Sequence, residues 1–368
     1  MLMDEFHMNQ ALSLAEKGWG TTNPNPLVGA VIVRDGHVIG EGYHAKLGGA
    51  HAERDALNQA ALNHQDVRGA TLYVTLEPCT HHGRTPPCTD AILESGIGEV
   101  VVAMQDPNPL VSGKGIQQLR EAGIKVRTGV LEQEAKKLNE IFITYMTHKK
   151  PFVIMKVAMT LDGKIATATG DSRWISCAMS RQYVHHWRNR VASIMVGSQT
   201  IFHDDPLLTT RLSGTVSQDP VRIVVDSVGR IPLESRVINN TSKVGMILAS
   251  TSRIPPERER QFTEKGVQVL KLDGFDGKVD LKALMNRLAQ MEIDSVLLEG
   301  GGNLNYAALR AGIVDKVLVI IAPKIIGGEA ATTPVEGSGF ARMEEAIKLN
   351  RMISTTCGED ILIEGYIT

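Results

Sequence analysis

The sequence has few cysteines and no long hydrophobic run, and each shortage excludes a class of protein. Four cysteines in 368 residues cannot build a disulfide framework, so cysteines spaced near histidines indicate a metal site in a reducing compartment. The apolar stretch 317–322 is far shorter than the roughly 20 residues that a membrane-spanning helix needs. The first ten residues carry the negative charges of Asp4 and Glu5, unlike a signal peptide. We therefore expect a soluble, cytoplasmic protein with no membrane partner.

Aromatic residues and an excess of positive charge are also lacking. Aromatic residues make up only 4% of the chain, which is few for a base-stacking platform. The net charge is −2, and residues 1–148 carry 12 Lys and Arg against 17 Asp and Glu, so that half is at −5 and residues 149–368 are at +3. Neither half has the basic excess of a nucleic-acid-binding protein. We therefore expect no nucleic-acid partner.

Alternating helix and strand patterns fill the chain in two successive blocks, and the length suits two globular domains. The polar segment 147–151 ends in Pro151 and interrupts the periodic patterns, so we place a boundary after residue 148. This organisation predicts an α/β protein with domains at residues 1–148 and 149–368. The 35 glycines suit the many tight turns of such a fold.

The periodicity of apolar residues predicts the individual elements. In the first half, Asp4 is expected to cap a helix that Gly18 ends, and Asp35-Gly36 to close a β-hairpin. The other predicted helices there are 52–62, 87–95, 116–122 and 132–146, and the predicted strands are 28–33, 38–43, 71–75, 100–104 and one around Val126. In the second half, the predicted strands are 152–158, 194–197, 221–226, 245–249, 267–270, 295–298 and 316–322, and the helices are 180–191, 256–265, 281–291 and 304–311.

His51, Glu53, Cys79 and Cys88 form the sharpest chemical pattern. One imidazole and two thiolates suit Zn²⁺ and leave a fourth tetrahedral position for water, as in catalytic zinc sites. Zinc lowers the pKa of such a water from about 15.7 to about 7, which makes hydroxide the nucleophile. Glu53 can accept the proton and deliver it to a leaving amine, so the pattern predicts hydrolytic deamination of a ring C–NH₂. The alternative is a structural zinc site closed by His81 or His82, which gives Glu53 no role.

The spacing of the two cysteines departs from the usual signature of zinc deaminases. That signature has two residues between the cysteines, whereas eight intervene here. The segment 74–88, with the Asn-Pro-Leu-Val-Gly segment 25–29 before it and the Gln-Asp-Pro-Asn-Pro segment 105–109 after it, resembles the bifunctional deaminase/reductases of riboflavin biosynthesis. The resemblance covers essentially the whole chain.

This resemblance implies a first domain with a cytidine-deaminase-like α/β/α fold. Its reaction would remove the 2-amino group of 2,5-diamino-6-ribosylamino-4(3H)-pyrimidinone 5′-phosphate by hydrolysis. His51, Cys79 and Cys88 would bind zinc, and Glu53 would be the catalytic proton shuttle. The family positions that contact base and ribose are matched by Asn25, His44, Asp106 and Asn108, all of which could instead be ordinary turn residues. Arg84, in the loop between the cysteines, offers a planar fork for a phosphate, or is a solvated loop charge.

A glycine turn marks the chemistry of the second half. Gly301 and Gly302 lie between a predicted strand and a predicted helix, where backbone N–H groups can bind an anion such as a dinucleotide pyrophosphate. The turn is not a G-x-G-x-x-G fingerprint, and such turns are common. Segments 160–164, 172–175, 197–211 and 322–328 resemble the reductase of the same family, whose fold is like that of dihydrofolate reductase. The resemblance implies NADPH-dependent reduction of the ribosyl group to ribityl.

The same resemblance implies which residues of the second domain contact cofactor and substrate. The cofactor contacts would be Ala158, Trp174, Thr200, Asp204, Ser227, Gly301, Gly302 and Asn303. The substrate contacts would be Ser172, Arg188, Leu208, Arg211 and Glu299. Arg188 and Arg211 suit a 5′-phosphate by charge, although both could be ordinary helix and loop charges.

Four further residues of this half have weaker signals. Arg230 follows Ser227 at a distance that suits the 2′-phosphate of NADPH. Lys156 could lie near the nicotinamide or the substrate, or extend outward into solvent. Cys177 and Cys357 have no partner at metal-ligand spacing and are predicted to be packing residues.

Two other functions are compatible with parts of the pattern. One is a tRNA or nucleoside deaminase with an appended reductase, against which the −5 charge of the first half and Arg84 both argue. The other is a zinc-stabilised scaffold that senses a dinucleotide. We also expect a homodimer, because a sheet edge in the second domain needs protection.

Overall fold

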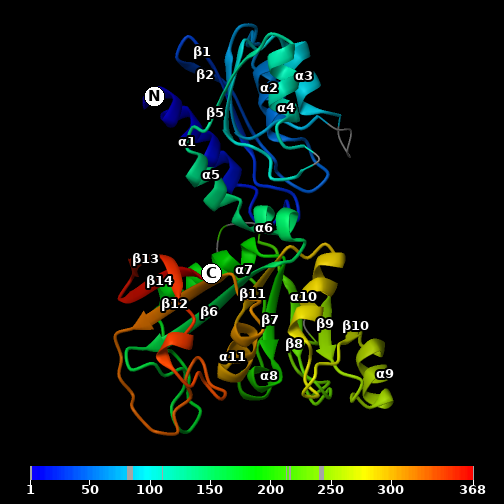
Figure 1. The fold of residues 1–368 in the computed structure, drawn as a ribbon, viewed down its shortest axis with the longest axis vertical. Helices are drawn as coiled ribbons and strands as arrows, with labels where there is room; N and C mark the ends of the chain where they lie inside the picture. Colours follow the sequence, from blue (N-terminus) through cyan, green and yellow to red (C-terminus); the bar gives the residue numbers. More distant parts are fainter. Residues whose placement is uncertain are drawn as a thin grey trace. The chain divides into compact units, whose positions relative to one another are not determined.

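Two structural units follow one another along the chain, Met1–Lys149 and Lys150–Thr368, and Figure 1 shows both. The division lies one residue from the boundary that the sequence indicated. The structure is a computed structural model that describes residues 2–80, 86–109, 111–212, 214, 217–239 and 244–367. Within these residues, no helix combines the length and the apolar character that a bilayer crossing requires.

The first unit is a five-stranded sheet with helices on both faces, which confirms the predicted α/β/α architecture (Figure 1). The strand order is β2-β1-β3-β4-β5, with β1 antiparallel to both β2 and β3, and with β3, β4 and β5 parallel. The strands are β1 (Gly29–Arg34), β2 (His37–Tyr43), β3 (Thr71–Leu76), β4 (Glu99–Met104) and β5 (Lys125–Thr128). Helices α1 (Leu2–Glu16) and α5 (Glu132–Leu138) pack on one face, helices α2 (Ala52–Leu62), α3 (Cys88–Ser95) and α4 (Lys114–Glu121) lie on the other, and α6 (Glu140–His148) follows α5.

Local chemistry explains why these strands form. β3 and β4 are central parallel strands covered on both faces, so nearly all of their residues are apolar and buried. The β1–β2 hairpin turns at Asp35 and Gly36, which both have positive φ as the predicted tight turn requires. Gly42 allows β2 to approach α2 closely, because a Cβ atom there would lie 2.3 Å from the Ala56 nitrogen. This close packing fixes the helix that begins next to His51.

Two predictions for the first unit are wrong. Asp4 does not cap the first helix, because α1 already begins at Leu2, and its carboxylate instead accepts hydrogen bonds from Tyr73 and Arg127. The single helix predicted at 132–146 is two helices that break at Asn139. The Asn139 side chain accepts a hydrogen bond from the Leu27 N–H and donates one to the Leu27 carbonyl, a contact across 112 residues of sequence.

The second unit is built on a nine-stranded sheet of order β10-β9-β8-β7-β11-β6-β12-β14-β13. Seven strands from β10 to β12 are parallel. β14 pairs antiparallel with β12, and the edge strand β13 pairs antiparallel with β14. The strands are β6 (Phe152–Thr160), β7 (Ser193–Gly197), β8 (Val221–Val225), β9 (Met246–Ser250), β10 (Val267–Lys271), β11 (Ser295–Leu298), β12 (Lys316–Ala322), β13 (Leu349–Cys357) and β14 (Asp360–Ile367). The helices are α7 (Ala178–Arg190), α8 (Ser198–Asp204), α9 (Pro256–Glu264), α10 (Leu281–Gln290) and α11 (Gly302–Arg310), with a 3₁₀ turn at Met343–Glu345.

Alternate residues of the central strands build a core on each side of this sheet. Met195 on β7 belongs to the cluster that contains Leu284 of α10, whereas its neighbour Ile194 belongs to the cluster that contains Ile201 of α8 and Phe262 of α9. Helices therefore cover both faces, as a largely parallel sheet requires. The unit has the dihydrofolate-reductase-like α/β fold that the resemblance implied.

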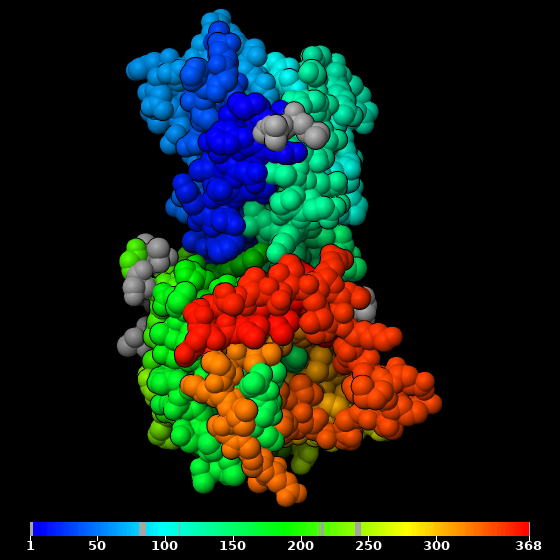
Figure 2. Space-filling model, turned by 90° about the vertical axis from the view of Figure 1, so that its left-hand side faces the viewer, coloured from blue at the N-terminus to red at the C-terminus, as the bar shows by residue number. Residues whose placement is uncertain are grey.

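The sequence did not predict α8 or the last two strands. β13 lies at the sheet edge, and seven of its nine residues are exposed, so it lacks the buried alternation that identifies a strand. Figure 2 shows the residues near the C-terminus as an unbroken red band on the surface of the second unit. The homodimer stays a prediction.

Candidate active sites

The predicted zinc ligands converge at the start of two helices in the first unit. His51 is the residue before α2, Cys88 is the first residue of α3, and Cys79 follows β3. Nδ1 of His51 lies 3.6 Å from the Cys79 sulfur and 3.3 Å from the Cys88 sulfur. The ligand atoms of all three residues lie within 4.8 Å of one another, so the donor set fits a zinc ion.

Hydrogen bonds within this cluster favour the thiolate form of Cys79. The Cys88 thiol, His51 and the Cys88 backbone N–H all donate to Cys79, and these bonds lower the pKa of the Cys79 thiol. A thiolate is the form of cysteine that binds metal. Arg54 holds the two helix starts together, because its Nη2 donates to the Pro87 carbonyl at 3.0 Å. Sequence reasoning missed Arg54, which follows the H-x-E motif directly.

Glu53 lies in the first turn of α2, and only 3% of its surface is exposed. Burial raises the pKa of Glu53 to about 7, and the charge of Cys79 raises it further, so the carboxyl group can both take up and release a proton near neutrality. The cluster and Glu53 therefore bring together a donor set that fits a metal and a buried carboxyl group, the two kinds of group that hydrolytic deamination requires.

Asn25 and His44 lie beside the cluster as a hydrogen-bonded pair. Nδ1 of His44 donates to the Ala50 carbonyl at 2.9 Å, so its Nε2 accepts from the Asn25 amide at 3.1 Å. Burial lowers the pKa of His44, which keeps the ring neutral. The His44 ring also packs edge-on against His51, with 5.3 Å between ring centroids. The structure thus brings two of the predicted base contacts to the zinc ligands.

Asp106 and Asn108 form a turn after β4, the strand next to β3 in the sheet. The Asp106 carboxylate accepts the Asn108 N–H at 2.8 Å, and Asp106 is 9% exposed. Because β3 and β4 are parallel, this turn follows the same sheet edge as Cys79. Arg84, His81 and His82 lie outside the described residues, so their predicted roles stay predictions.

The second unit contains a cavity of about 570 Å³ at the carboxyl ends of its parallel strands. Eight of the predicted contacts line it, and they come from β6, the loop before α7, α7 itself, α8, the loop after Asp204 and the residue after β11. These residues are Ala158, Ser172, Trp174, Arg188, Asp204, Leu208, Arg211 and Glu299. The carboxyl edge of an open α/β sheet is the usual place for a ligand.

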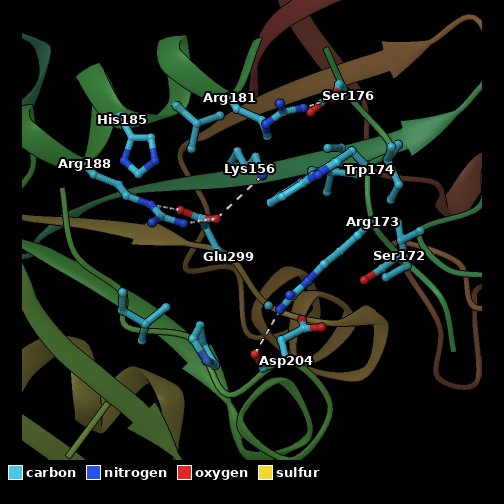
Figure 3. A pocket seen from close by; sticks show the side chains of 18 of the residues that line it. Lys156, Ser172, Arg173, Trp174, Ser176, Arg181, His185, Arg188, Asp204 and Glu299 are labelled. Atoms are coloured by element: carbon cyan, nitrogen blue, oxygen red, sulfur yellow. Dashed lines mark hydrogen bonds and ion pairs between the residues drawn. The ribbon is translucent and has the colours of Figure 1, made fainter. Parts of the chain in front are cut away.

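Glu299 is the centre of a buried charge cluster in this cavity. The Arg188 Nε and Nη2 atoms donate to the two Glu299 oxygens at 2.7 and 3.0 Å, and Nζ of Lys156 lies 3.6 Å away (Figure 3). Burial alone would raise the pKa of Glu299, but Arg188 and Lys156 outweigh it and hold the pKa at about 2. Lys156 therefore points into the cavity, and the alternative of an outward side chain does not hold.

The remaining donor of Arg188 changes the expectation for this residue. Its Nη1 donates to the Thr209 carbonyl at 3.1 Å, so all three guanidinium nitrogens have partners within the protein. Arg188 therefore orients Glu299, and its predicted phosphate contact stays untested. The guanidinium of Arg211 is less constrained than that of Arg188, and its Nη1 donates to the Thr209 hydroxyl at 3.2 Å. The geometry makes Arg211 the better candidate for a phosphate.

Several polar residues of the cavity wall were missed from the sequence, among them Arg173, Arg181 and His185. Arg181, His185 and Arg188 lie four and three residues apart on α7, so helical spacing from Arg188 would have indicated the other two. The Arg181 guanidinium lies 4.4 Å from the Trp174 ring centroid. Burial and the charge of Arg188 lower the pKa of His185 to about 4, so the ring is neutral at neutral pH. Arg173, beside Trp174, donates to the Asp204 carbonyl (Figure 3).

The other predicted cofactor contacts do not line this cavity, although they follow the same strand ends. Thr200 is on α8 after β7, Ser227 follows β8, and Gly301, Gly302 and Asn303 are at the start of α11 after β11. Arg230, the suggested contact for the 2′-phosphate of NADPH, is exposed and does not line the cavity either. The Cys177 thiol donates to the Cys357 carbonyl at 3.3 Å, and the predicted packing roles of Cys177 and Cys357 stay predictions.

A carboxylate of the protein itself lies at the glycine turn before α11. The Asn303 amide donates to Glu336 at 2.8 Å, and a Cβ atom on Gly302 would lie 2.4 Å from the Glu336 Cγ. The predicted anion site is therefore in contact with a negative side chain. A pyrophosphate bound at this turn would lie beside the Glu336 carboxylate.

The two units together define a bifunctional enzyme with a zinc deaminase domain and a reductase domain. The family model of the cytidine and deoxycytidylate deaminase zinc-binding region matches residues 1–104, and that of the RibD C-terminal domain matches residues 151–363. The first of these is a zinc-binding family, and the second indicates a nicotinamide cofactor. The chain belongs to the RibD family of riboflavin biosynthesis proteins.

Relatives match along the full chain. The riboflavin biosynthesis protein RibD of Actinobacillus pleuropneumoniae is 46% identical over 366 residues, which cover 100% of this chain and 96% of the relative. The solved structure of Acinetobacter baumannii RibD is 37% identical, with a TM-score of 0.87 over 100% of this chain and 99% of that one. A diaminohydroxyphosphoribosylaminopyrimidine deaminase/5-amino-6-(5-phosphoribosylamino)uracil reductase from Thermotoga maritima is 40% identical, with the same TM-score and the same coverage. The chain is thus a deaminase/reductase of the riboflavin pathway.

Proposed function

We propose that residues 1–148 deaminate 2,5-diamino-6-ribosylamino-4(3H)-pyrimidinone 5′-phosphate and that residues 149–368 then reduce the ribosyl group of the product to ribityl with NADPH. The observation that carries the proposal is the His51, Cys79 and Cys88 cluster beside the buried Glu53. The named activity of the Thermotoga maritima relative supports the choice of substrate. This membership in a riboflavin family favours the proposal over a nucleoside deaminase or a sensing scaffold.

In the deaminase domain, His51, Cys79 and Cys88 would hold zinc, which supplies a water molecule activated as the nucleophile. Glu53 would take a proton from that water on a carboxyl oxygen and deliver it to the departing amino group. Its burial beside the cluster supports this role, because burial raises the pKa of the carboxyl group and so favours uptake of a proton. Ammonia is the second product.

Asn25 and His44 would orient the pyrimidine. The Asn25 amide NH₂ donates to His44, and its carbonyl oxygen would accept a hydrogen bond from a ring amino group. The neutral His44 ring keeps this orientation because its Nδ1 is held by Ala50. Asp106 and Asn108 would contact the base and ribose from the neighbouring strand end, and Arg84 would bind the phosphate.

In the reductase domain, the cavity would hold the substrate beside the nicotinamide. Arg211 would bind the 5′-phosphate, while Glu299, fixed by Arg188 and Lys156, would accept hydrogen bonds from ribose hydroxyl groups. Ser172 and Leu208 would complete the substrate contacts. Hydride transfer depends above all on the relative position of donor and acceptor, and a cavity wall fixed by ion pairs supplies that rigidity.

NADPH would follow the carboxyl edge of the sheet. The proposed contacts lie at successive strand ends: Ala158 on β6, Trp174 in the loop before α7, Thr200 and Asp204 on α8, and Ser227 after β8. The turn before α11, at Gly301, Gly302 and Asn303, would bind the pyrophosphate. The net charge of +3 in this half is compatible with two anionic ligands. The choice of NADPH over NADH is tested by comparing initial rates with the two cofactors at equal concentrations.

The proposal as a whole is tested by product analysis. Incubation of the zinc-loaded protein with the diaminopyrimidine phosphate should release one ammonia per substrate without NADPH, and adding NADPH should then convert the ribosyl product to its ribityl form. Release of ammonia without later oxidation of NADPH would remove the proposed role of the second domain. Oxidation of NADPH before any ammonia release would reverse the proposed order.

A further inference from the structure

Glu77 is a buried carboxylate that the proposed chemistry leaves without a role. It is 3% exposed, and it lies directly after β3 and two residues before the zinc ligand Cys79. A buried carboxylate is costly unless its oxygens are satisfied by hydrogen bonds. Its partners therefore indicate what it does.

Four backbone N–H groups donate to the two Glu77 oxygens. Oε2 accepts from Asp106 at 3.1 Å and from Gly113 at 2.9 Å. Oε1 accepts from Gly115 at 2.9 Å and from Ile116 at 3.2 Å. Among the described residues, no side-chain cation takes part in these bonds. The carboxylate is held by backbone N–H groups of the loop between β4 and α4 and of the first turn of α4.

This loop carries the proposed pyrimidine contacts and the start of α4. Asp106, whose N–H binds Glu77, is itself a proposed substrate contact, and its carboxylate fixes Asn108 through the Asn108 N–H. Gly115 and Ile116 belong to the first turn of α4, whose N–H groups have no helical partner and favour a negative charge. Glu77 thus ties both ends of the loop to the end of β3.

A second contact joins the same two segments from the other side. A Cβ atom on Gly115 would lie 2.1 Å from the carbonyl oxygen of Pro78, the residue between Glu77 and Cys79. The first turn of α4 therefore rests against the backbone that leads to the zinc ligand. The Glu77 N–H also donates to the Met104 carbonyl at the end of β4.

From these contacts we infer that Glu77 is a positioning residue that sets the Asp106–Asn108 turn at a fixed place relative to the zinc ligand Cys79. Catalysis needs the pyrimidine carbon held at the metal, and the pyrimidine contacts and the metal ligand lie on different strands. The Glu77 carboxylate links the two strand ends through four hydrogen bonds. The inference rests on the proposed deamination and on the proposed role of Asp106 and Asn108 in it.

Glu77→Gln in the full-length, zinc-loaded enzyme tests this link. The glutamine keeps the shape but presents an NH₂ group to two of the four N–H donors, so that half of the loop is pushed away. We expect KM for the diaminopyrimidine phosphate to rise about tenfold, with a smaller fall in kcat and unchanged zinc content per chain. Reduction of the already deaminated substrate by the same variant should be unchanged, since that site lies in the other unit.

Two further variants make the test specific. Glu94→Gln changes an exposed glutamate on α3 and should leave both activities unchanged. Glu77→Asp keeps the charge and both oxygens but shortens the side chain, so its KM should lie between those of the parent and Glu77→Gln. If Glu77→Gln does not fold, Glu77→Asp serves in its place with the same prediction of a raised KM and retained zinc.

The outcomes separate the inference from the function on which it rests. An unchanged KM in Glu77→Gln would overturn the inference. A fall in kcat that follows loss of zinc at constant KM would also overturn it, because Glu77 would then stabilise the fold without positioning the substrate contacts. If the parent enzyme releases no ammonia from the diaminopyrimidine phosphate, the proposed function fails first and the inference fails with it.

Discussion

The sulfur of Cys88 lies 3.3 Å from Nδ1 of His51, although 37 residues separate them in the chain. Each residue stands at the start of a helix, and the two helices lie on the same face of the first sheet. Cys79 completes the set from the end of β3. The fold therefore brings three ligands together that the sequence places in two separate motifs.

Removal of zinc should separate the two activities of the chain. Dialysis against a strong chelator should abolish ammonia release, because the nucleophile needs the metal. Reduction of the deaminated substrate by NADPH should persist, since the second unit contributes none of the three ligands. Ammonia assays and NADPH absorbance before and after chelation measure both, and re-addition of zinc is the control. Loss of both activities on chelation would contradict separate sites.

Glu299→Gln should destabilise the second unit and stop reduction. The change leaves Arg188 and Lys156 with a neutral partner in a buried site, which costs about 3 kcal/mol in the free energy of unfolding. The matched double variant Arg188→Met with Glu299→Gln removes the unpaired guanidinium and should recover much of that stability without recovering reduction. Urea unfolding and NADPH oxidation with deaminated substrate measure the two effects. Full reductase activity in the single variant would refute a substrate role for Glu299.

Stability of the first unit should depend on Asp4 in acid. The Arg127 guanidinium, with Tyr73, lowers the pKa of Asp4 from 3.8 to about 2. A carboxylate whose pKa is depressed by folding stabilises the fold above its unfolded pKa, and this contribution is lost as pH falls from about 4 to about 2. Asp4→Asn should therefore lower the free energy of unfolding by about 1 kcal/mol at pH 7 and leave it unchanged below about pH 2. Glu16→Gln, exposed at the end of α1, is the control. A cost for Asp4→Asn that does not change with pH would contradict this account.

Neutralising Glu336 should improve the binding of NADPH. Its carboxylate lies against Gly302 and holds Asn303, where the pyrophosphate is proposed to bind. Removal of a negative charge from a helix N-terminus that must accept an anion should lower KM for NADPH about two- to fivefold. Initial rates of Glu336→Gln across a range of NADPH concentrations test this, with the exposed Glu329→Gln as control. A raised KM in Glu336→Gln would show that the carboxylate assists the cofactor.

Local sequence patterns were sufficient for most elements and for the grouping of His51, Cys79 and Cys88. His51 and Glu53 are two residues apart at a helix start, so a metal ligand with a neighbouring proton carrier can be predicted from the sequence without the fold. The break between α5 and α6 could not be predicted, because it depends on Asn139 reaching Leu27 across 112 residues. β13 was missed for a different reason: an exposed edge strand has no buried face to produce alternation.

Long-range pairing limited the prediction of the reductase site. Arg188 and Glu299 were both expected to contact substrate, but their sequence contexts, 111 residues apart, contain no sign that they bind each other. Glu336 shows the same limit, since nothing near it in the sequence indicates that it reaches the turn before α11. Helical spacing on α7, by contrast, could have indicated Arg181 and His185.

Oxidation of NADPH by the zinc-loaded protein and by Glu53→Gln, each supplied with the diaminopyrimidine phosphate, tests the central claim most directly. The account predicts oxidation by the parent and none by the variant, because the reductase acts on the deaminated product. Both proteins should oxidise NADPH when given that product directly. Oxidation of NADPH by Glu53→Gln from the diaminopyrimidine phosphate would contradict the role of Glu53 or the order of the two reactions.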